Sequence, residues 1–352
     1  MASSSTDHTT PGGSPPARRA GASIGDVARL AGVSAQTVSR VSNGAENVLP
    51  ATRSRVLDAM ERLGYAPNHA ARALRTGSFA AIGVVVHRLA RTGESSTVDA
   101  IVDAARREGY TVNLVDVASP SPDDVTAALQ RLSNQSVDGL IIVRAETATP
   151  TSLSLPARTP VVVADSRFVG HHPAVGADQV TGAAAAVQHL LDLGHRTVHL
   201  LAGPPESGPA QLRAQAWRTT LAQSGRRIPE PVQGDWSAES GYAAGRVLAA
   251  DDDVTAVFSA NDEMATGLLH ALHEAGRRVP QHVSVVGFDD IPLASHLWPP
   301  LTTVRQDFTQ VGEELVRLLL EQIRSRATLV DRTVVVPAPL VLRASTAPPC
   351  RA

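Results

Sequence analysis

Two patterns of hydrophobic and polar positions divide the chain. Residues 23–64 alternate short patterns of helical period with tight breaks, whereas residues 80–345 alternate β-rich apolar runs with amphipathic helical stretches. Two different periods indicate two architectures on one chain. Residues 1–21 are rich in Ser, Thr, Pro and Gly and show neither pattern, so we expect them to form a disordered leader.

The longer region predicts repeated strand–helix units. Strands are expected at residues 80–86, 111–117, 139–143, 160–165, 197–202, 254–259, 283–288 and 333–342. Helices are expected at residues 98–108, 179–193, 209–224, 238–250 and 262–275. This alternation indicates parallel sheets with helices on both faces, and ligands of such sheets bind at the carboxyl ends of the strands. The region is too long for one sheet, so we expect two lobes with a cleft between them.

The shorter region has the packing requirements of a helix-turn-helix. Ala28 is small enough for a second helix to cross closely, and Gly32 permits the positive φ of a tight turn. Val33 and Val38 fill the angle between the two helices. Ser34 is placed to cap the second helix by accepting a hydrogen bond from its first backbone N–H groups.

A third helix is expected at residues 50–63, because apolar residues recur there at helical spacing. Those expected to close the small core are Val56, Leu57, Met60 and Leu63. A core of this size is typical of a module that folds alone only marginally.

The second helix is expected to present polar side chains to the outside. With Val38 and Val41 turned inward, the outward positions are Ala35, Gln36, Ser39, Arg40 and Asn43. Gln36 and Arg40 lie one turn apart on the same face, where glutamine suits the edge of adenine and arginine the edge of guanine. An ordinary solvated helix face carries the same residue types, so this pattern alone leaves that alternative open.

Composition and charge narrow the class of protein. The 352-residue chain has a formal net charge of −2, which argues against a wholly basic nucleic-acid coat protein. Between Arg18 and Gly77, however, the chain has nine arginines and only four acidic residues. Positive charge is therefore concentrated around the expected helix-turn-helix. The single cysteine, Cys350, fits a reducing compartment. The first residues do not resemble a secretory signal and no apolar run could span a membrane, so we expect a cytoplasmic protein.

The helix-turn-helix region also carries a series of motifs in a fixed order. They are Asp26-Val-Ala, Gly32-Val-Ser, Thr37-Val-Ser-Arg and Gly64-Tyr65-X-Pro67-Asn68. These motifs resemble the DNA-binding headpiece of the lactose/galactose repressor family. The resemblance implies operator contacts from Ser34, Ala35, Gln36, Thr37, Ser39, Arg40, Asn43, Asn68, Ala71 and Leu74. It also implies that residues 68–74 form a hinge helix on specific DNA, with Leu74 wedged into the minor groove.

The resemblance continues through the longer region, where it is closest to the lactose repressor branch of the family. It rests on Leu200-Leu-Ala-Gly-Pro204, Gln211-Leu-Arg213, Gly234-Asp-Trp236-Ser-Ala, Ala260-Asn261-Asp262, Val285-Val-Gly-Phe-Asp289-Asp and Pro300-Leu-Thr-Thr-Val-Arg-Gln306-Asp-Phe308. The sugar contacts that it implies are Asp165, Arg213, Trp236, Asn261, Asp289, Gln306 and Phe308. We expect these residues at strand ends, in loops after strands or on the helix that opens the C-terminal lobe.

These residue types suit a sugar. Carboxylate, carboxamide and guanidinium groups offer paired acceptors and donors to adjacent hydroxyls, and the C–H face of a pyranose packs on an indole. Each residue also has a structural explanation. Asp289 could cap the following turn, Asn261 could cap the helix that begins at Asp262, and Trp236 could belong to the core.

Two departures from the family change the expectations. Between His87 and Gly93 the chain is polar and charged, where the lactose repressor has small apolar residues, so the part of the ligand beyond its first sugar stays unassigned. After the expected strand at residues 333–342 no leucine heptad follows. The coiled coil of tetrameric relatives is therefore missing, and we expect a homodimer.

The predicted organisation is a leader at residues 1–21, an all-α helix-turn-helix headpiece at 22–66 and a hinge helix with linker at 67–78. A two-lobed α/β core of the periplasmic-binding-protein type, with parallel sheets, follows at 79–346, and a tail at 347–352. The resemblance implies a transcriptional repressor of a sugar-utilisation operon that binds a palindromic double-stranded DNA operator. A small sugar inducer, a galactoside, would release it. The alternatives are a β-glucoside or cellobiose-type inducer and, in a different class, a sugar-binding transport protein.

An enzyme is not expected. Glycosidases need two carboxylates at a defined separation, and nothing identifies an acid to partner Asp165 or Asp289. No catalytic residue and no cofactor is therefore assigned. His171-His172 and Asp251–Asp253 lack the ligand spacing of a metal site and are expected in exposed loops.

Overall fold

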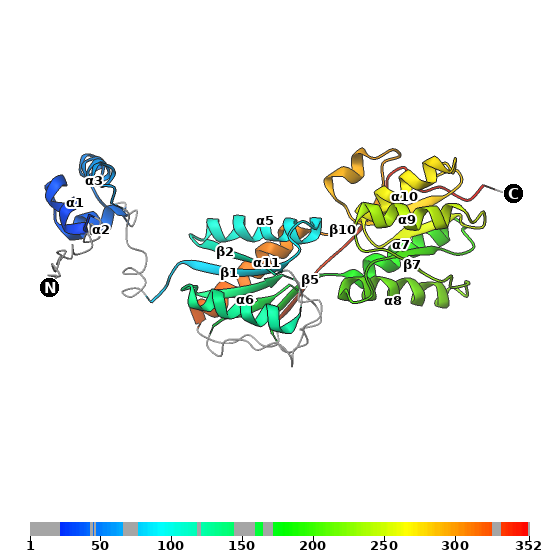
Figure 1. Ribbon diagram of the computed structural model, residues 1–352, viewed down its shortest axis with the longest axis horizontal. Helices are drawn as coiled ribbons and strands as arrows, with labels where there is room; N and C mark the ends of the chain where they lie inside the picture. Colours follow the sequence, from blue (N-terminus) through cyan, green and yellow to red (C-terminus); the bar gives the residue numbers. More distant parts are fainter. Residues whose placement is uncertain are drawn as a thin grey trace, which may run out of the picture. The chain divides into compact units, whose positions relative to one another are not determined.

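The computed structural model describes residues 22–42, 45, 47–65, 77–117, 121–143, 159–164, 172–325 and 332–350. The chain divides into two compact units, Met1–Gly77 and Ser78–Ala352 (Figure 1). The expected leader and hinge helix lie outside the described residues. The same is true of five expected contact residues, which are Asn43, Asn68, Ala71, Leu74 and Asp165.

The described part of the first unit is helical. Its elements are α1 (Ile24–Ala31), α2 (Ala35–Ser42) and α3 (Pro50–Leu63). At the start of α1, Ser23 and Asp26 cap each other's backbone N–H groups, which satisfies donors that the helix itself cannot. Gly32 ends α1 with a φ of 64°, and the Oγ of Ser34 accepts a 3.1 Å hydrogen bond from the N–H of Thr37, both as expected.

The core of this unit differs from the expectation in α3. Val27, Val38 and Val56 are fully buried. Leu57 and Leu63, expected in the core, are 51% and 36% exposed, so that expectation is wrong. The two short helices α1 and α2 cover only a narrow stripe of α3, and the small Ala59 together with Met60 fills the space beside Val56.

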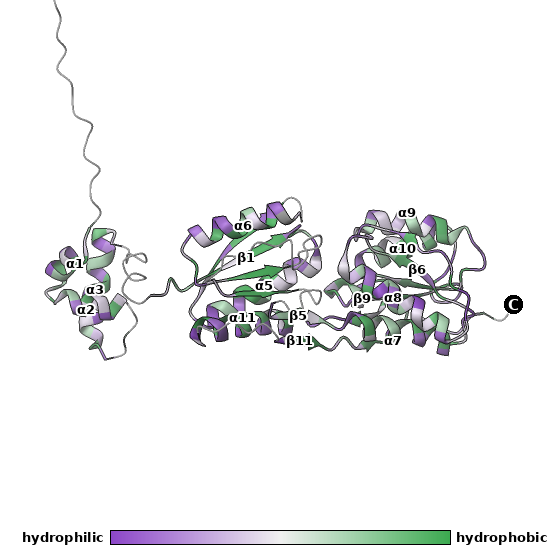
Figure 2. Ribbon diagram, turned by 90° about the horizontal axis from the view of Figure 1, so that it is seen from below, coloured by the Kyte–Doolittle hydropathy of each residue, from purple (hydrophilic) through white to green (hydrophobic). Residues whose placement is uncertain are grey.

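The second unit has two lobes, each a sheet between two layers of helices. In the N-terminal lobe the strand order is β11-β5-β4-β3-β1-β2, and every pairing is parallel. The strands are β1 (Ala81–His87), β2 (Thr111–Val117), β3 (Gly139–Val143), β4 (Val161–Val163), β5 (Ala174–Ala177) and β11 (Thr333–Val336). Helices α5 (Thr92–Arg107) and α11 (Phe308–Ser325) pack on one face, and α6 (Pro122–Asn134) on the other. The sheet is apolar and the outer sides of the helices are polar (Figure 2), as a layer buried on both faces requires.

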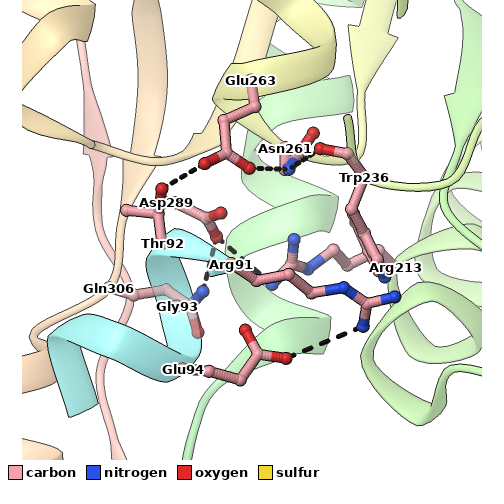
Figure 3. Close-up of a pocket in the computed structure, with 10 residues that line it drawn as sticks. All are labelled: Arg91, Thr92, Gly93, Glu94, Arg213, Trp236, Asn261, Glu263, Asp289 and Gln306. Carbon is pink, nitrogen blue, oxygen red and sulfur yellow. Dashed lines mark hydrogen bonds and ion pairs between the residues drawn. The ribbon is translucent and has the colours of Figure 1, made fainter. Parts of the chain in front are cut away.

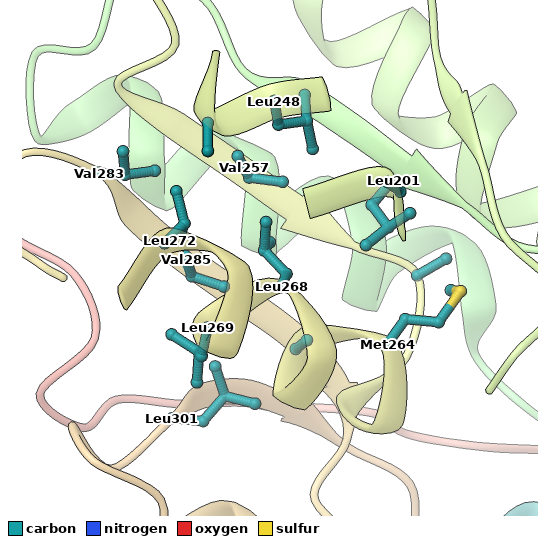
Figure 4. Packing of buried hydrophobic residues seen from close by; sticks show 14 of the residues in the cluster. Leu201, Leu248, Val257, Met264, Leu268, Leu269, Leu272, Val283, Val285 and Leu301 are labelled. Carbon is teal, nitrogen blue, oxygen red and sulfur yellow. The ribbon is translucent and has the colours of Figure 1, made fainter. Parts of the chain in front are cut away.

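In the C-terminal lobe the strand order is β12-β10-β9-β8-β6-β7. The strands are β6 (His199–Ala202), β7 (Val232–Gln233), β8 (Ala256–Ser259), β9 (Ser284–Asp289), β10 (Thr302–Arg305) and β12 (Leu340–Val341), of which only β12 runs antiparallel to its neighbour. Helices α7 (Gln179–Asp192) and α8 (Gly208–Gln223) cover one face, and α9 (Ala238–Ala249) and α10 (Asp262–Glu274) the other. Leu248, Leu268 and Val257 meet in the core beneath α9 and α10 (Figure 4). A short 3-10 helix, η2 (Pro292–His296), follows β9.

The chain passes between the lobes three times, after β5, after β10 and after β11. The strand expected at residues 333–342 is therefore wrong as a single element, because it is divided into β11 in one lobe and β12 in the other. Pro337 and Pro339 separate the two, since neither residue can donate a hydrogen bond within a sheet.

Other differences are local. Strands β5, β7 and β10 and helices α6 and α11 were not expected, and α5 begins at Thr92 rather than at residue 98. The remaining expected strands and helices lie within about two residues of their predicted bounds. The alternation of apolar strands and amphipathic helices along the sequence thus predicts most of the fold.

Candidate functional site

A pocket lies where the two lobes of the second unit meet at the carboxyl ends of their strands (Figure 3). Its cavity volume is only about 20 Å³, far below the roughly 300–1,000 Å³ of small-molecule sites, so its walls must move apart to admit a ligand. The N-terminal lobe contributes the first turn of α5, and the C-terminal lobe contributes residues that follow its strands. The lining residues are Arg91, Thr92, Gly93, Glu94, Arg213, Trp236, Asn261, Glu263, Asp289 and Gln306. We call this space the polar compartment.

Arg213 is the central cation of the polar compartment. It lies on α8 and is only 2% exposed, and its Nε donates a 2.7 Å hydrogen bond to the Oε1 of Gln179. Its Nη1 donates to the carbonyl of Ala260, and its Nη2 lies 3.4 Å from the Oδ1 of Asp289. The guanidinium also stacks 3.7 Å from the ring centre of Phe288. A planar cation held from several sides in this way keeps one orientation.

Arg213 and three other side chains form a closed loop of polar contacts. Gln179 donates a 2.8 Å hydrogen bond from its Nε2 to the Oε1 of Gln306. Gln306 in turn donates a 2.6 Å hydrogen bond from its Nε2 to the Oδ1 of Asp289, which pairs with Arg213. Arg213, Asp289 and Gln306 are among the contacts expected from the sequence, whereas Gln179, which begins α7 directly after the unexpected strand β5, is not. Arg213 itself lies on α8, the second helix of the C-terminal lobe, and not on the helix that opens it.

Asp289 ends β9 in an unusual backbone conformation. Its φ is 115°, and that of Asp290 is 55°. Residues other than glycine rarely adopt positive φ, and such conformations occur where the surrounding structure imposes them, often at binding sites. Asp290 is held by Arg305 at 2.6 Å and by Arg343 at 2.5 Å, which anchors the turn from which Asp289 points into the pocket.

Behind the pocket lies a second carboxyl group, that of Asp262. It is fully buried at the start of α10, and it accepts hydrogen bonds from the hydroxyl of Thr303 at 2.6 Å and from the N–H of Ile291 at 3.0 Å. Burial, reinforced by the nearby charge of Asp289, raises the pKa of Asp262 well above its ordinary value. Asp262 thus connects α10, β10 and the turn after β9 beneath the binding surface.

Trp236 forms one wall of the polar compartment. Its φ is 80° and its side chain rests on Gly203, where any Cβ would come within 2.4 Å of the indole. The residue is 5% exposed, and its indole Nε1 is buried without a hydrogen-bond partner among the described residues. An indole N–H in this position can donate to a ligand, and the indole face can pack on one.

Asn261 combines a structural role with its place in the pocket. Its Oδ1 accepts a 2.9 Å hydrogen bond from the N–H of Met264, which caps α10. Its Nδ2 donates to the carbonyl of Trp236 at 3.0 Å and to the Oε2 of Glu263 at 3.1 Å. The cap considered as an alternative for Asn261 is therefore present. What Asn261 can still offer a ligand is the second lone pair of its Oδ1.

The wall from the N-terminal lobe is polar. The hydroxyl of Thr92 donates to the Oε1 of Glu263 across the cleft, and the Nη1 of Arg91 lies 3.7 Å from the Oε1 of Glu94. Arg91 and Thr92 belong to the segment His87–Gly93 that departs from the family, and Glu94 follows that segment directly. His87, at the start of that segment, instead contacts the carbonyl of Val117 through its Nδ1 and is buried.

A second space adjoins the first and shares Gly93, Glu94 and Gln306 with it. Its cavity volume is about 70 Å³, and most of its other lining residues are apolar, so we call it the apolar compartment. They include Phe308, which sequence analysis expected beside the sugar contacts, together with Val175 and Val311.

Metal binding has no support in the described part of the chain, where no group of three or more His, Cys, Asp or Glu side chains could hold an ion. Asp251–Asp253 form an exposed turn there, and His171 lies outside the described residues. None of the described helices is both long and apolar enough to cross a membrane.

The candidate nucleic-acid interface is α2 of the first unit. Ala35, Gln36 and Arg40 are exposed, whereas Val38 and Val41 are buried in the core, as the packing argument required. Ser34 is exposed and caps the helix, and Thr37 and Ser39 are partly buried. The side chains proposed to read bases thus share the outer face of one short helix.

Two families match the chain. Residues 23–68 match the family of bacterial regulatory proteins described as the lacI family, and residues 187–346 match the periplasmic binding protein-like domain. The first match covers the described helices of the first unit, and the second covers most of the C-terminal lobe together with α11 and β11.

Three curated relatives are similar over most of their length. The lactose operon repressor of Escherichia coli (strain K12) is 36% identical over 338 residues, which cover 92% of this chain and 90% of the relative. The ribose operon repressor of the same strain is 33% identical over 308 residues, or 86% of this chain and 93% of the relative. The transcriptional repressor PurR of Vibrio cholerae serotype O1 (strain M66-2) is 33% identical over 315 residues, or 87% and 92%.

Two solved structures extend the likeness to three dimensions. A lac repressor dimer bound to operator and the anti-inducer ONPF is 35% identical and superimposes with a TM-score of 0.81, covering 93% of this chain and 99% of that one. A complex of the transcriptional regulator CelR with cellobiose is 32% identical with a TM-score of 0.69, covering 92% and 99%. The predicted fold class, a helix-turn-helix headpiece before a two-lobed α/β core, is confirmed by these matches.

Proposed function

This chain belongs to the lacI family of bacterial regulatory proteins, and from that premise we propose that it is a transcriptional repressor whose affinity for its operator is controlled by a galactoside. The single observation that supports a sugar ligand is the closed loop of polar contacts beside Trp236. It is formed by Arg213, Gln179, Gln306 and Asp289. The relatives are transcriptional repressors, which favours a regulator and not an enzyme.

The chemistry of the pocket supports a neutral, hydroxyl-bearing ligand. Asp289 and Gln306 offer fixed acceptors and donors, and Arg213 offers donors in a planar fork. Trp236 adds an apolar face for the C–H side of a pyranose and an indole N–H with no described partner. Because the groups are buried, a ligand that lacks a matching hydroxyl would leave them unpaired, which makes the site selective.

The choice of a galactoside rests on likeness. The motifs that contain Arg213, Trp236, Asn261, Asp289 and Gln306 resemble the lactose repressor branch of the family, and the lactose operon repressor is the most identical of the three curated relatives. A β-glucoside such as cellobiose is the second candidate, because the CelR structure in complex with cellobiose is also similar to this chain. The same polar groups serve either pyranose, and one hydroxyl configuration separates them.

The proposed mechanism uses a homodimer, as in the similar lac repressor dimer bound to operator. Two copies of α2 would occupy successive major grooves of a palindromic site, with phosphate contacts providing affinity and base contacts providing specificity. Since the pocket is lined by both lobes, a bound sugar favours one orientation of the lobes over another. Only that preference can change the affinity for DNA.

A transport protein shares the two-lobed domain, since residues 187–346 match periplasmic binding proteins. The family match at residues 23–68 adds a DNA-binding module that transport does not need. A cytoplasmic repressor is therefore the function that we propose.

The experiment starts by selecting double-stranded DNA that the purified protein binds, and then measures fluorescence anisotropy of that DNA during titration with lactose, methyl β-galactoside, cellobiose and ribose. A galactoside is expected to weaken DNA binding. An effect of cellobiose alone would overturn the galactoside, and no effect of any sugar would overturn sugar control.

A further inference from the structure

We infer that Glu94 is a specificity-determining residue of the effector pocket. It selects effectors that place a hydroxyl donor at the junction of the two compartments. It rejects effectors with an apolar or anionic substituent there. This inference rests on the proposed function, because it assumes a sugar beside Arg213 and Asp289. The ligand class that it names is a neutral, polyhydroxylated molecule of two units, such as a disaccharide.

The position of Glu94 is the first argument. Together with Gly93 and Gln306 it lines both the polar and the apolar compartment, so a ligand that occupies both must pass it. Figure 3 shows its side chain in the first turn of α5, facing the guanidinium of Arg91 and below Asp289. A substituent that extends from a sugar in the polar compartment therefore meets Glu94 first.

The burial of Glu94 is the second argument. It is 2% exposed, and glutamates are almost never buried to this degree without a partner or a function. Arg91 lies 3.7 Å away, and the N-terminal turn of a 16-residue helix favours negative charge. Both features compensate a negative charge at this position.

The hydrogen-bonding capacity of a carboxylate is the third argument. An ionised carboxylate only accepts hydrogen bonds, so the complementary ligand group is a donor such as a hydroxyl. An alkyl or aryl group placed against Glu94 would cover the carboxylate without compensating it, which is unfavourable. The hydroxyl of Thr97, which donates to the carbonyl of Gly93 at 2.7 Å, fixes the backbone beside it.

The charge of the compartment is the fourth argument. Its two arginines each lie beside a carboxylate, Arg91 beside Glu94 and Arg213 beside Asp289. Glu263 adds a third carboxylate, so the lining of the polar compartment carries one more negative than positive charge. An acidic sugar would meet net repulsion in a space of low dielectric.

The test compares four chains, namely wild type, Glu94→Gln, Glu94→Leu and the control Asp99→Asn, an exposed acid on the same helix. Calorimetry measures the affinity of each for lactose, methyl β-galactoside, phenyl β-galactoside and methyl β-galacturonide, and circular dichroism verifies that each variant is folded. Glu94→Gln keeps the size of the side chain, so it serves if Glu94→Leu does not fold.

Wild type is expected to prefer lactose to phenyl β-galactoside by about tenfold or more. Glu94→Leu is expected to reverse this preference, Glu94→Gln to weaken it and to admit the galacturonide, and Asp99→Asn to leave it unchanged. If wild type binds sugars but Glu94→Gln and Glu94→Leu keep its preference, the role of Glu94 is wrong and the proposed function stands. If wild type binds none of the four sugars, the proposed galactoside function itself is overturned.

Discussion

Arg213 and Asp289 form a buried ion pair with 3.4 Å between Nη2 and Oδ1, and their side chains are only 3% and 10% exposed. Arg213 lies on α8 and Asp289 ends β9, so this ion pair links the helix to the carboxyl end of the strand. The sugar is proposed to bind beside both. Buried charges of this kind depend on each other, because removal of one leaves the other without compensation.

We predict that Asp289→Asn lowers sugar affinity by about tenfold or more, or about 1.4 kcal/mol and above. The amide keeps the shape but removes the charge opposite Arg213 and one acceptor for hydroxyls. Calorimetry with a galactoside measures the loss, and Asp253→Asn, an exposed acid of the same lobe, is the control. Unchanged affinity in Asp289→Asn would remove this residue from the proposed site.

We predict that Gly203→Ala weakens sugar binding through Trp236. The added methyl group would lie 2.4 Å from the indole, so the ring must shift from its place in the wall of the pocket. Overpacking of this kind costs about 1–3 kcal/mol. Indole fluorescence during sugar titration reports the change, although Trp217 and Trp298 contribute to the signal. A matched change at Gly225, which has open space around it but a positive φ, separates backbone strain from displacement of the indole.

We predict that Gln36→Ala and Arg40→Ala each weaken operator binding by about 1–3 kcal/mol, if each makes a bidentate contact to a base. Sugar affinity should stay the same, because both residues lie in the other compact unit. Arg62→Ala is the control, since it removes an exposed arginine from α3 that pairs with Asp58 at 3.6 Å. Equal losses in all three variants would indicate general attraction to DNA and not base reading.

We predict that Asp262→Asn becomes more stable relative to wild type as pH rises above 3.8, the ordinary pKa of the carboxyl group. Burial raises the pKa of Asp262 in the folded state, so between the two pKa values the folded chain binds more protons than the unfolded chain. Wild type therefore loses stability as pH rises through that range. Asparagine has no such proton, and Thr303 can accept its N–H.

Urea unfolding of both chains at several pH values, followed by circular dichroism, measures this difference. The expected slope is at most about 1.4 kcal/mol per pH unit. Titrating groups that do not interact with Asp262 are common to the two chains and cancel. A difference that does not change between pH 4 and pH 8 would contradict the raised pKa of Asp262.

The sequence predicts most of the fold because apolar runs and amphipathic stretches are local signals. Strand β1 and helix α10, for example, are each recovered to within about one residue. β5 was missed because Ala174–Ala177 is short and made of small residues, and the pairing of β11 and β12 with different sheets is a long-range property. The exposure of Leu57 is a further example, because helical spacing does not predict how wide a face of α3 the other helices cover.

The candidate site was predicted where a family motif and an expected strand end coincide, as at Asp289, or from the motif alone, as at Gln306 after the unexpected strand β10. Gln179 was missed because it follows an unexpected strand, and Glu94 and Glu263 because no motif contains them. Asn261 illustrates why residue type alone does not assign a role, since the same amide caps α10 and lines the pocket.

The three passages between the lobes also determine the order in which a ribosome can complete them. The segment from α7 to β10 contains nearly the whole C-terminal sheet and emerges as one stretch, so this lobe can fold once it is released. The N-terminal lobe is translated first, yet the buried leucines of α11 and the edge strand β11 reach it only near the end of synthesis. Until then its sheet carries an open edge and an apolar face that α5 covers only in part, the features that expose a nascent chain to chaperones and to aggregation.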